Sequence, residues 1–194
     1  MPVIHKTAFI HPQATVIGSA EIAENVMVSP HASIRGDEGT PLYIGNSSNV
    51  QDCVVIHSLE THGEDEKEIE GRMVEVDDNK YAVYVGERVS LAHQSQIHGP
   101  SRIGNDTFIA MQALVFNANV GNNCVLEPKS GIVGASVPDN RYIPAGVVIT
   151  SQEDADKLPE IYEDYPYKNT NKAVVQINIE LAEGYHKLFD EQKD

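Results

Sequence analysis

Three of the eight histidines sit inside an aliphatic repeat, and their number and spacing could hold a metal ion. His57 and His98 each directly follow an isoleucine of the repeat and share one phase, whereas His93 lies five residues before His98. Three neutral imidazoles with one open position are what a catalytic zinc requires, and such ligands also suit divalent iron or cobalt. The same side chains could instead form a hydrogen-bonded cluster at an interface. Spacing alone leaves both interpretations open.

The elements that must position these histidines repeat every six residues. Aliphatic residues keep this period from Ile4 to Ile34, from Ile44 to Ile56 and from Val85 to Val115. A period of six fits neither a lone amphipathic helix nor an alternating strand, and it is typical of stacked coils. One hexad is too small to bury its apolar side, so neighbouring coils must stack into a continuous core. We therefore predict one all-β solenoid over residues 1–150.

Two insertions and one slip interrupt the repeat. The step from Ile34 to Ile44 is about four residues too long, which predicts a surface or interface loop over residues 35–39. Residues 60–82 form an acidic excursion that leads into a strand-like alternation at 80–84. After Val115 the phase slips by one residue, which predicts an irregular corner near residues 116–119.

Residues 151–194 read as a C-terminal helical segment. Ser151 supplies a capping hydroxyl before an acidic turn, so we expect a short helix that Pro159 stops. A second helix is expected from about Asn171 to Phe189, lying against the outside of the solenoid. The three-four spacing of its apolar residues, with a glycine that permits close approach, predicts one packing stripe. That stripe consists of Val174, Ile177, Leu181, Gly184 and Leu188.

Solenoid geometry predicts that the three histidines meet only between subunits. Adjacent hexads of a triangular stack lie on different faces, so His93 lies on another face than His57 and His98. One chain would struggle to aim all three rings at one point. Two solenoids packed side by side bring different faces together, which predicts an intersubunit site.

Charge and composition limit the partners and the compartment. Lys and Arg number 14 against 29 Asp and Glu, and the net charge of -15 argues against nucleic acid or an anionic membrane. Cys53 and Cys124 lack metal-type spacing and are expected to be buried thiols. The N-terminus lacks the pattern of a signal peptide, so we expect a cytoplasmic protein, although an export signal removed beforehand would leave the same pattern.

Five motifs together resemble the gamma-class carbonic anhydrases, and most closely their archaeal Cam-type branch, for which an acidic excursion after His57 is characteristic. The resemblance covers nearly the whole chain. It implies a left-handed parallel β-helix with a C-terminal α-helix alongside, assembled as a homotrimer with metals between subunits. The motifs are Ser-Ile-Arg35-Gly-Asp37-Glu38-Gly, Asn49-Val-Gln51-Asp52, Val-Ile-His57-Ser-Leu-Glu60, Ser-Leu-Ala-His93-Gln-Ser-Gln-Ile-His98-Gly and Asn178-Ile-Glu-Leu-Ala-Glu-Gly-Tyr185.

The resemblance implies a metal-dependent lyase, a carbonate dehydratase. Its reaction would be the reversible hydration of carbon dioxide to bicarbonate and a proton by a metal-bound hydroxide at the trimer interfaces. The ligands would be His57, His93 and His98, with His93 from the neighbouring chain. The metal would be Zn²⁺, with Fe²⁺ or Co²⁺ as alternatives, and no organic cofactor is implied.

The resemblance also implies a path for the proton. Gln51 would hydrogen-bond the hydroxide and orient it, Glu38 would take the proton as the hydroxide attacks, and Glu60 would pass it outward.

Other positions resemble binding and supporting groups of the family. Arg35 and Asp37 look like a pair that ties subunits together, with Arg35 also near the product bicarbonate. Asn49 and Asp52 look like supporting groups near that pair. Asn178 resembles the amide that helps to hold carbon dioxide.

One position departs from the family prototype, which has a tyrosine where this chain has Gln176, two residues before Asn178. The resemblance therefore implies the ligands and the proton path, but not the contribution of that tyrosine to the pocket.

Two other functional classes share such a solenoid. A hexapeptide-repeat acyltransferase would explain His93 as a base, but not three histidines together with Gln51, Glu38 and Glu60, and the negative charge is unfavourable for anionic coenzyme A. The other class is a metal-binding or assembly protein that kept the fold and lost activity, which the presence of every candidate residue except the tyrosine disfavours.

Overall fold

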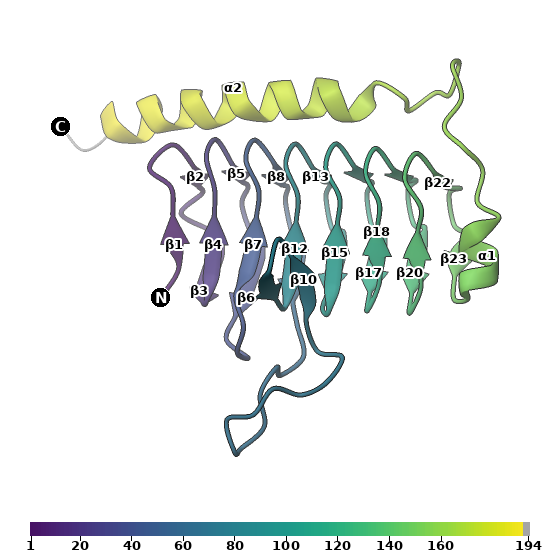
Figure 1. The fold of residues 1–194 in the computed structure, drawn as a ribbon. Coiled ribbons are helices and arrows are strands. Elements are labelled where there is room, and N and C mark those ends of the chain that lie inside the picture. The colour runs from purple at the N-terminus through teal and green to yellow at the C-terminus, as the bar shows by residue number, and fades with distance from the viewer. Residues whose placement is uncertain (192–194) are drawn as a thin grey trace.

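The computed structural model describes residues 1–191, which form a parallel solenoid with one long helix at its side (Figure 1). Three seven-stranded parallel sheets, named A, B and C below, form its three faces. Each coil contributes one strand to each sheet in turn, and equivalent residues pair from coil to coil. The predicted left-handed parallel β-helix with a C-terminal α-helix alongside is confirmed.

The strands are short because one face of a coil is only one hexad wide. Sheet A contains β1 (Val3–Ile4), β4 (Ala20–Ile22), β7 (Leu42–Ile44), β12 (Val83–Val85), β15 (Ser101–Ile103), β18 (Asn119–Val120) and β21 (Ser136–Val137). Sheet B contains β2 (Phe9–Ile10), β5 (Met27–Val28), β8 (Asn49–Val50), β13 (Ser90–Leu91), β16 (Phe108–Ile109), β19 (Val125–Leu126) and β22 (Tyr142–Ile143). Sheet C contains β3 (Thr15–Gly18), β6 (Ser33–Gly36), β9 (Val55–His57), β14 (Gln96–His98), β17 (Leu114–Phe116), β20 (Gly131–Val133) and β23 (Val148–Ile149).

The aliphatic residue of each hexad points into the solenoid and forms its core. Val50, Leu91 and Ile97 are fully buried, as are their equivalents in most coils. Burial of such a side chain contributes about 1.5–3 kcal/mol relative to leaving it exposed. Ile4 remains 42 % exposed because its strand, β1, is an edge strand of sheet A.

The register of the sheets confirms the predicted interruptions. Ile22 pairs with Ile44, so this coil is four residues longer than the neighbouring coil that pairs Ile4 with Ile22. The extra residues form the loop between β6 and β7. Ile97 pairs with Val115, 18 residues on, whereas the next pair on sheet A, Ile103 with Val120, spans 17 residues.

The acidic excursion leaves the solenoid after β9 and returns through an antiparallel hairpin of β10 (Val74–Val76) and β11 (Asn79–Tyr81). It projects away from the long helix (Figure 1). The ring of Tyr81 lies 5.7 Å from that of Tyr43 and 5.2 Å from that of Tyr84, and Tyr43 stacks on Tyr84 at 5.1 Å between centroids. This aromatic cluster holds the returning strand against sheet A.

The two thiols differ, so the expectation that both are buried is wrong for Cys53. Cys53 is exposed at the corner between sheets B and C, where a left-handed φ of 60° turns the chain outward. Cys124 is buried as expected, and burial raises the pKa of its thiol to about 11.

The C-terminal segment contains two helices. The first, α1 (Gln152–Asp156), begins as expected with Ser151 as its cap, whose Oγ accepts from the N–H of Asp154 at 3.2 Å. The second, α2 (Thr170–Glu191), runs back along sheet B toward the first coils (Figure 1). Residues 192–194 of the expected segment 151–194 lie outside the described residues. Neither helix among residues 1–191 is long and apolar enough to cross a membrane.

The stripe predicted to pack α2 against the solenoid is wrong except for Val174, which is half-buried and packs beside Tyr165 and Phe108. Ile177, Leu181 and Leu188 are 55, 41 and 46 % exposed, and Gly184 faces open space. The packed face instead carries Asn171, Val175, Asn178, Ala182 and Tyr185. Two faces of α2 have three-four spacing. The buried face contains Asn171 and Asn178, whose side-chain amides donate hydrogen bonds to backbone carbonyls.

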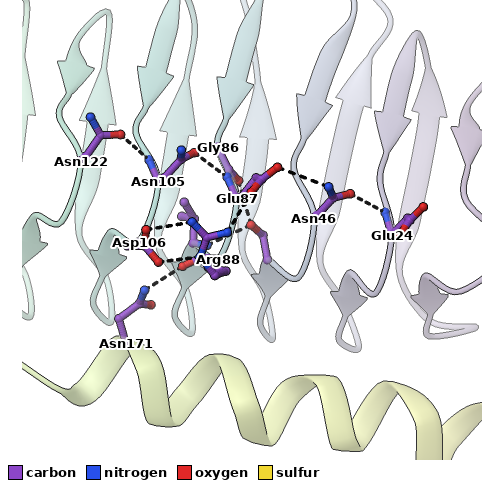
Figure 2. Close-up of polar contacts among 11 residues, drawn as sticks. Glu24, Asn46, Gly86, Glu87, Arg88, Asn105, Asp106, Asn122 and Asn171 are labelled. Carbon is purple, nitrogen blue, oxygen red and sulfur yellow. Dashed lines mark hydrogen bonds and ion pairs between the residues drawn. The ribbon is translucent and has the colours of Figure 1, made fainter.

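Polar contacts join the start of α2 to the corner between sheets A and B (Figure 2). Oδ1 of Asn105 accepts from the N–H of Glu87 in the preceding coil at 2.9 Å. Arg88 pairs with Asp106 through Nε at 2.7 Å and Nη2 at 3.0 Å. The carbonyl of Arg88 accepts from Nδ2 of Asn171 at 2.7 Å, so the corner holds the first turn of α2 in place.

Candidate active site

His57 and His98 lie side by side on the outer surface of sheet C. They are paired residues of neighbouring strands, β9 and β14, and their ring centroids are 5.6 Å apart. Each follows an isoleucine that points into the core, so the alternation of a strand turns both imidazoles outward. Phe116, the paired residue of β17, stacks on His98 at 5.1 Å between centroids.

One nitrogen of the His98 ring is already engaged. Nδ1 lies 3.0 Å from the carbonyl oxygen of Gly99, which can only accept, so Nδ1 carries the proton. Nε2 therefore keeps its lone pair. Histidines that bind metals commonly donate their other ring nitrogen to a carbonyl or carboxylate in this way.

His93 shows the same arrangement at the corner between sheets B and C. It is exposed, and its Nδ1 lies 3.0 Å from Oδ2 of Asp52, the equivalent residue of the preceding coil. Donation of Nδ1–H to this carboxylate leaves Nε2 free and fixes the ring. The free Nε2 atoms of His93 and His98 are nitrogen donors of the kind that divalent transition metals take.

The three histidines do not converge within one chain. His93 lies before the start of β14, at the corner between sheets B and C. His57 and His98 are the last residues of β9 and β14, near the corner between sheets C and A. Within residues 1–191 of a single chain, no group of three or more His, Cys, Asp and Glu side chains is placed to hold a metal.

Charged groups from β6 and from the loop after it surround His57. Its Nε2 lies 3.0 Å from Nη2 of Arg35, 3.3 Å from Oδ1 of Asp37 and 3.4 Å from Oε1 of Glu38. Arg35 also donates from Nε to Asp37 at 3.2 Å. Desolvation raises the pKa of the Asp37 carboxyl, but its backbone hydrogen bond, Arg35 and His57 outweigh this effect, so the pKa is lowered overall.

Gln51 is buried at the end of β8, and its side-chain amide is oriented by a short chain of hydrogen bonds. Nδ2 of Asn49 donates to Oγ of Ser90 at 2.9 Å, which turns Oδ1 of Asn49 toward Gln51. Nε2 of Gln51 donates to that oxygen at 2.9 Å. Oε1 of Gln51 is thereby directed away from Asn49 as an acceptor. Asn49 thus orients the side-chain amide of Gln51, and Asp52 orients the ring of His93.

A hollow beside His57 joins the loop after β6 to the acidic excursion. Its lining consists of Asp37, Glu38, Gly39, Glu60, His62, Gly63 and Glu66. The structure thus brings Glu38 and Glu60 to one cavity, although they are 22 residues apart in sequence.

Thr61 fixes the two walls of this hollow. It is fully buried, and its N–H donates to the carbonyl of Glu38 at 3.0 Å. Its Oγ1 accepts from the N–H of Thr40 at 2.8 Å and lies 2.9 Å from Nδ1 of His62. The sequence pattern gives no sign of Thr61, and it groups His62 with surface histidines. The sequence contains one indication of a role for His62, which is that it lies two residues after Glu60.

Asn178 lies on the buried face of α2, where its Nδ2 donates to the carbonyl of Val174 at 2.9 Å. Gln176, the position that departs from the prototype, is exposed on α2 and donates to Glu180 at 2.8 Å.

Comparison with known proteins assigns the family. No protein-family model matches the sequence. The chain is 62 % identical over 184 residues to the carbonic anhydrase of Methanosarcina thermophila, an alignment that covers 95 % of this chain and 74 % of that protein. The chain belongs to the gamma-class carbonic anhydrases. Membership of this family of lyases implies a catalytic metal.

Other relatives of this gamma-class carbonic anhydrase are more distant or longer. Gamma carbonic anhydrase 1 of Arabidopsis thaliana mitochondria is 28 % identical over 149 residues, covering 76 % of this chain and 46 % of that protein. The carboxysome assembly protein CcmM of Nostoc is 42 % identical over 183 residues, covering 94 % of this chain but only 31 % of that protein.

Solved structures share the solenoid of this carbonic anhydrase. A hexapeptide transferase family protein from Anaplasma phagocytophilum is 20 % identical with a TM-score of 0.58, covering 95 % of this chain and 92 % of that one. A putative acetyltransferase from Bacillus cereus is 18 % identical with a TM-score of 0.59, covering 96 % and 92 %. At such identities the likeness concerns the fold alone and does not favour acyl transfer.

Proposed function

We propose that this chain catalyses the reversible hydration of carbon dioxide to bicarbonate and a proton at a metal site shared between the subunits of a homotrimer. The observation that carries the proposal is the state of the ring nitrogens. His93 and His98 each engage Nδ1 and leave Nε2 free, and His57 stands beside His98 on the same surface. With His93 supplied by a neighbouring subunit, three imidazoles can face one point.

The metal that suits three imidazoles is zinc, with divalent iron or cobalt as alternatives. When bound, such an ion lowers the pKa of water to about 7 and so supplies a strong nucleophile at neutral pH. The ligands would be His57, His98 and the neighbouring subunit's equivalent of His93.

Gln51 would orient the attacking water. Because Nε2 of its amide is held by Asn49, Oε1 is the atom left to accept a hydrogen bond. A fixed acceptor restricts the directions from which the nucleophile can approach carbon dioxide, which lowers the entropic part of the barrier.

Glu38 and Glu60 would carry the proton away. Glu38 is 3.4 Å from Nε2 of His57 and is therefore placed to take a proton released as the carbon–oxygen bond forms. Glu60 lines the same hollow and is exposed, so it can pass the proton outward. Arg35, whose Nη2 points at the same histidine nitrogen, would pair with the negative charge of bicarbonate.

Asn178 would contribute to holding carbon dioxide. Its amide nitrogen has two hydrogens, and the bond to Val174 occupies one of them. The other remains for an oxygen of the substrate. This role rests on the family resemblance, together with the buried position of Asn178 on α2.

Exposed apolar side chains support the homotrimer. On sheet C, Ile17, Phe116 and Val148 are 42, 37 and 55 % exposed, and the outer face of α2 adds Ile177 and Leu181. A neighbouring copy is the occupant that these surfaces suit best, because the metal site needs His93 from another chain. Cyclic assembly would give every subunit the same contacts.

The test is replacement of each proposed ligand by alanine in protein loaded with one zinc per chain. His57→Ala, His93→Ala and His98→Ala should each lose zinc and nearly all hydration of carbon dioxide, because an open catalytic site needs three protein ligands. His5→Ala is the control, since His5 lies on the first coil beside Glu24. Full zinc content and turnover in His93→Ala would show that the ligand assignment is wrong.

A further inference from the structure

We infer that His62 extends the proton path, receiving the proton from Glu60 and releasing it to buffer outside the acidic excursion. The inference rests on the proposed function, because the proton to be moved is the one that hydration releases. His62 and Glu60 line one hollow together with Glu38, and His62 is half-buried, whereas Glu60 is exposed.

Imidazole is the side chain suited to this task. Histidine gains and loses a proton between about pH 5 and 8, whereas ordinary carboxylates stay ionised in that range. A group that both accepts and releases protons at neutral pH carries them to buffer faster than a carboxylate alone. His62 is the histidine that shares the hollow with both glutamates.

The hydrogen bonds around Thr61 assign the ring nitrogens of His62. Oγ1 of Thr61 lies 3.4 Å from the carbonyl of Glu38, to which it can donate its hydrogen. Oγ1 of Thr61 accepts from the N–H of Thr40 at 2.8 Å, and the hydroxyl of Thr40, 3.0 Å away, can turn its hydrogen to Sδ of Met73 at 3.2 Å. The second lone pair of Thr61 Oγ1 can then accept Nδ1–H of His62 at 2.9 Å. Nδ1 then carries the proton of the neutral ring, and Nε2 is the atom that can accept another.

The proposed step moves one proton and breaks no other bond. The protonated carboxyl of Glu60 gives its proton to Nε2 of His62, leaving a carboxylate and an imidazolium. The imidazolium then loses a proton to a buffer base and returns to the neutral ring. The carboxylates of Asp37, Glu38, Glu60 and Glu66 face the hollow, and Glu68 pairs with His62 through a backbone bridge.

The test variant is His62→Asn, because asparagine Nδ2 can replace Nδ1–H toward Thr61 but offers no nitrogen that accepts a proton. In zinc-loaded holoenzyme at low buffer concentration, kcat should fall roughly 3- to 10-fold, less than the ~10²- to 10⁴-fold that acid–base catalysis can supply, because Glu60 can still release protons to buffer directly. The ratio kcat/KM, which reports hydration itself, should stay unchanged. Added imidazole should restore kcat.

Two further measurements distinguish a series relay from a purely structural role of His62. In a series relay, Glu60→Ala with His62→Asn should be no slower than Glu60→Ala alone. In metal-free protein, the NMR resonances of the His62 ring should change position when Glu60 is replaced by Gln, since both groups line the hollow. His5→Asn is the control and should match the unchanged protein, because His5 pairs with Glu24 away from the hollow.

Some outcomes would overturn the inference and leave the proposed function standing. Unchanged kcat in His62→Asn at low buffer, with Glu60→Ala slow, would remove His62 from the path. A double variant slower than both single variants by the product of their effects would show parallel routes instead of a relay. Absence of hydration activity in the unchanged zinc-loaded protein would instead refute the proposed function and the relay with it.

Discussion

In both His93 and His98, Nδ1 is held by a hydrogen bond and Nε2 is left for the candidate metal site. Nδ1 of His98 is held by a backbone carbonyl of its own strand end, and Nδ1 of His93 by the carboxylate of Asp52 in the preceding coil. His93 is exposed, so a rotating ring would point in many directions without this contact. Asp52 is therefore expected to prepare the lone pair on Nε2 for binding.

Replacement of Asp52 tests this support. Asp52→Ala should weaken zinc binding by roughly 10- to 100-fold, the usual effect of removing a group that orients a metal ligand. Asp52→Asn should weaken it less, because an amide oxygen still accepts from Nδ1–H. Competition with a zinc chelator measures both affinities.

The matched control for this series is Asp106→Ala, which removes a carboxylate that pairs with Arg88 at another corner. It should leave zinc affinity unchanged. Equal zinc affinity in Asp52→Ala and the unchanged protein would mean that Asp52 does not orient His93.

At the level of elements, two insertions in the repeat meet to form the hollow. The loop after β6 supplies Glu38, the excursion after β9 supplies Glu60, and Thr61 bonds one to the other. Gly39 allows this junction. Its φ is +117°, and a Cβ at this position would lie 1.9 Å from Oγ1 of Thr61.

Gly39→Ala should therefore disturb both glutamates together. The hydroxyl of Thr61 is buried and bonded, so it cannot move aside without breaking contacts. We expect both kcat/KM and kcat for hydration to fall, since Glu38 and Glu60 act at different steps. The strained backbone alone should cost about 1–3 kcal/mol of stability.

Gly71→Ala separates strain from displacement. Gly71 lies in the same excursion with a φ of +72°, but its added Cβ would meet nothing within 4 Å. This variant should lose stability and keep its kinetics. Normal kinetics in Gly39→Ala would show that the junction does not position the glutamates.

A side chain of the first turn of the long helix, Asn171, bonds it to the solenoid. Nδ2 of Asn171 donates to the carbonyl of Arg88, and Asn178 follows two turns later on the same buried face. Asn171→Ala leaves that carbonyl without its donor and should lower the free energy of unfolding by about 1–3 kcal/mol.

The neighbouring exposed residue provides the comparison. Lys172→Ala should change stability by no more than about 0.5 kcal/mol. Urea unfolding of both variants, with amide exchange of the first turns of α2, gives the measurement. Equal stability of the two variants would assign the docking of α2 to its apolar contacts alone.

For the whole molecule, the sequence predicts the solenoid well because its signal is repeated many times. Every hexad adds one aliphatic residue at the same phase, so the positions of Ile97 and its equivalents determine the three faces and even the 17-residue coils. The packing face of α2 could not be predicted in this way. Ile177 and Asn178 lie on different three-four stripes, and only the shape of sheet B decides between them.

The site was predictable to the extent that it follows the repeat. The phase of His57 and His98 predicts that they are neighbours, and the structure pairs them. The hollow was not predictable, because Thr61 and His62 belong to an insertion with no periodicity. Their places depend on long-range hydrogen bonds, which leave no pattern in a single sequence.

The central proposal is a metal site that takes His57 and His98 from one subunit and His93 from the next. In a cyclic trimer this makes two inactive variants complementary, because each can supply what the other lacks. Trimers that mix His93→Ala and His57→Ala chains would contain one complete site each, formed where an intact His57 meets an intact His93.

The measurement is zinc content and carbon dioxide hydration after the two purified variants are unfolded, mixed in equal amounts and refolded with zinc. Each variant refolded alone should be inactive. Random mixing should restore about a quarter of the unchanged protein's activity and zinc, since about three trimers in four are mixed and each has one of three sites complete. A mixture as inactive as its separate components, although mixed trimers have formed, would contradict a site shared between subunits.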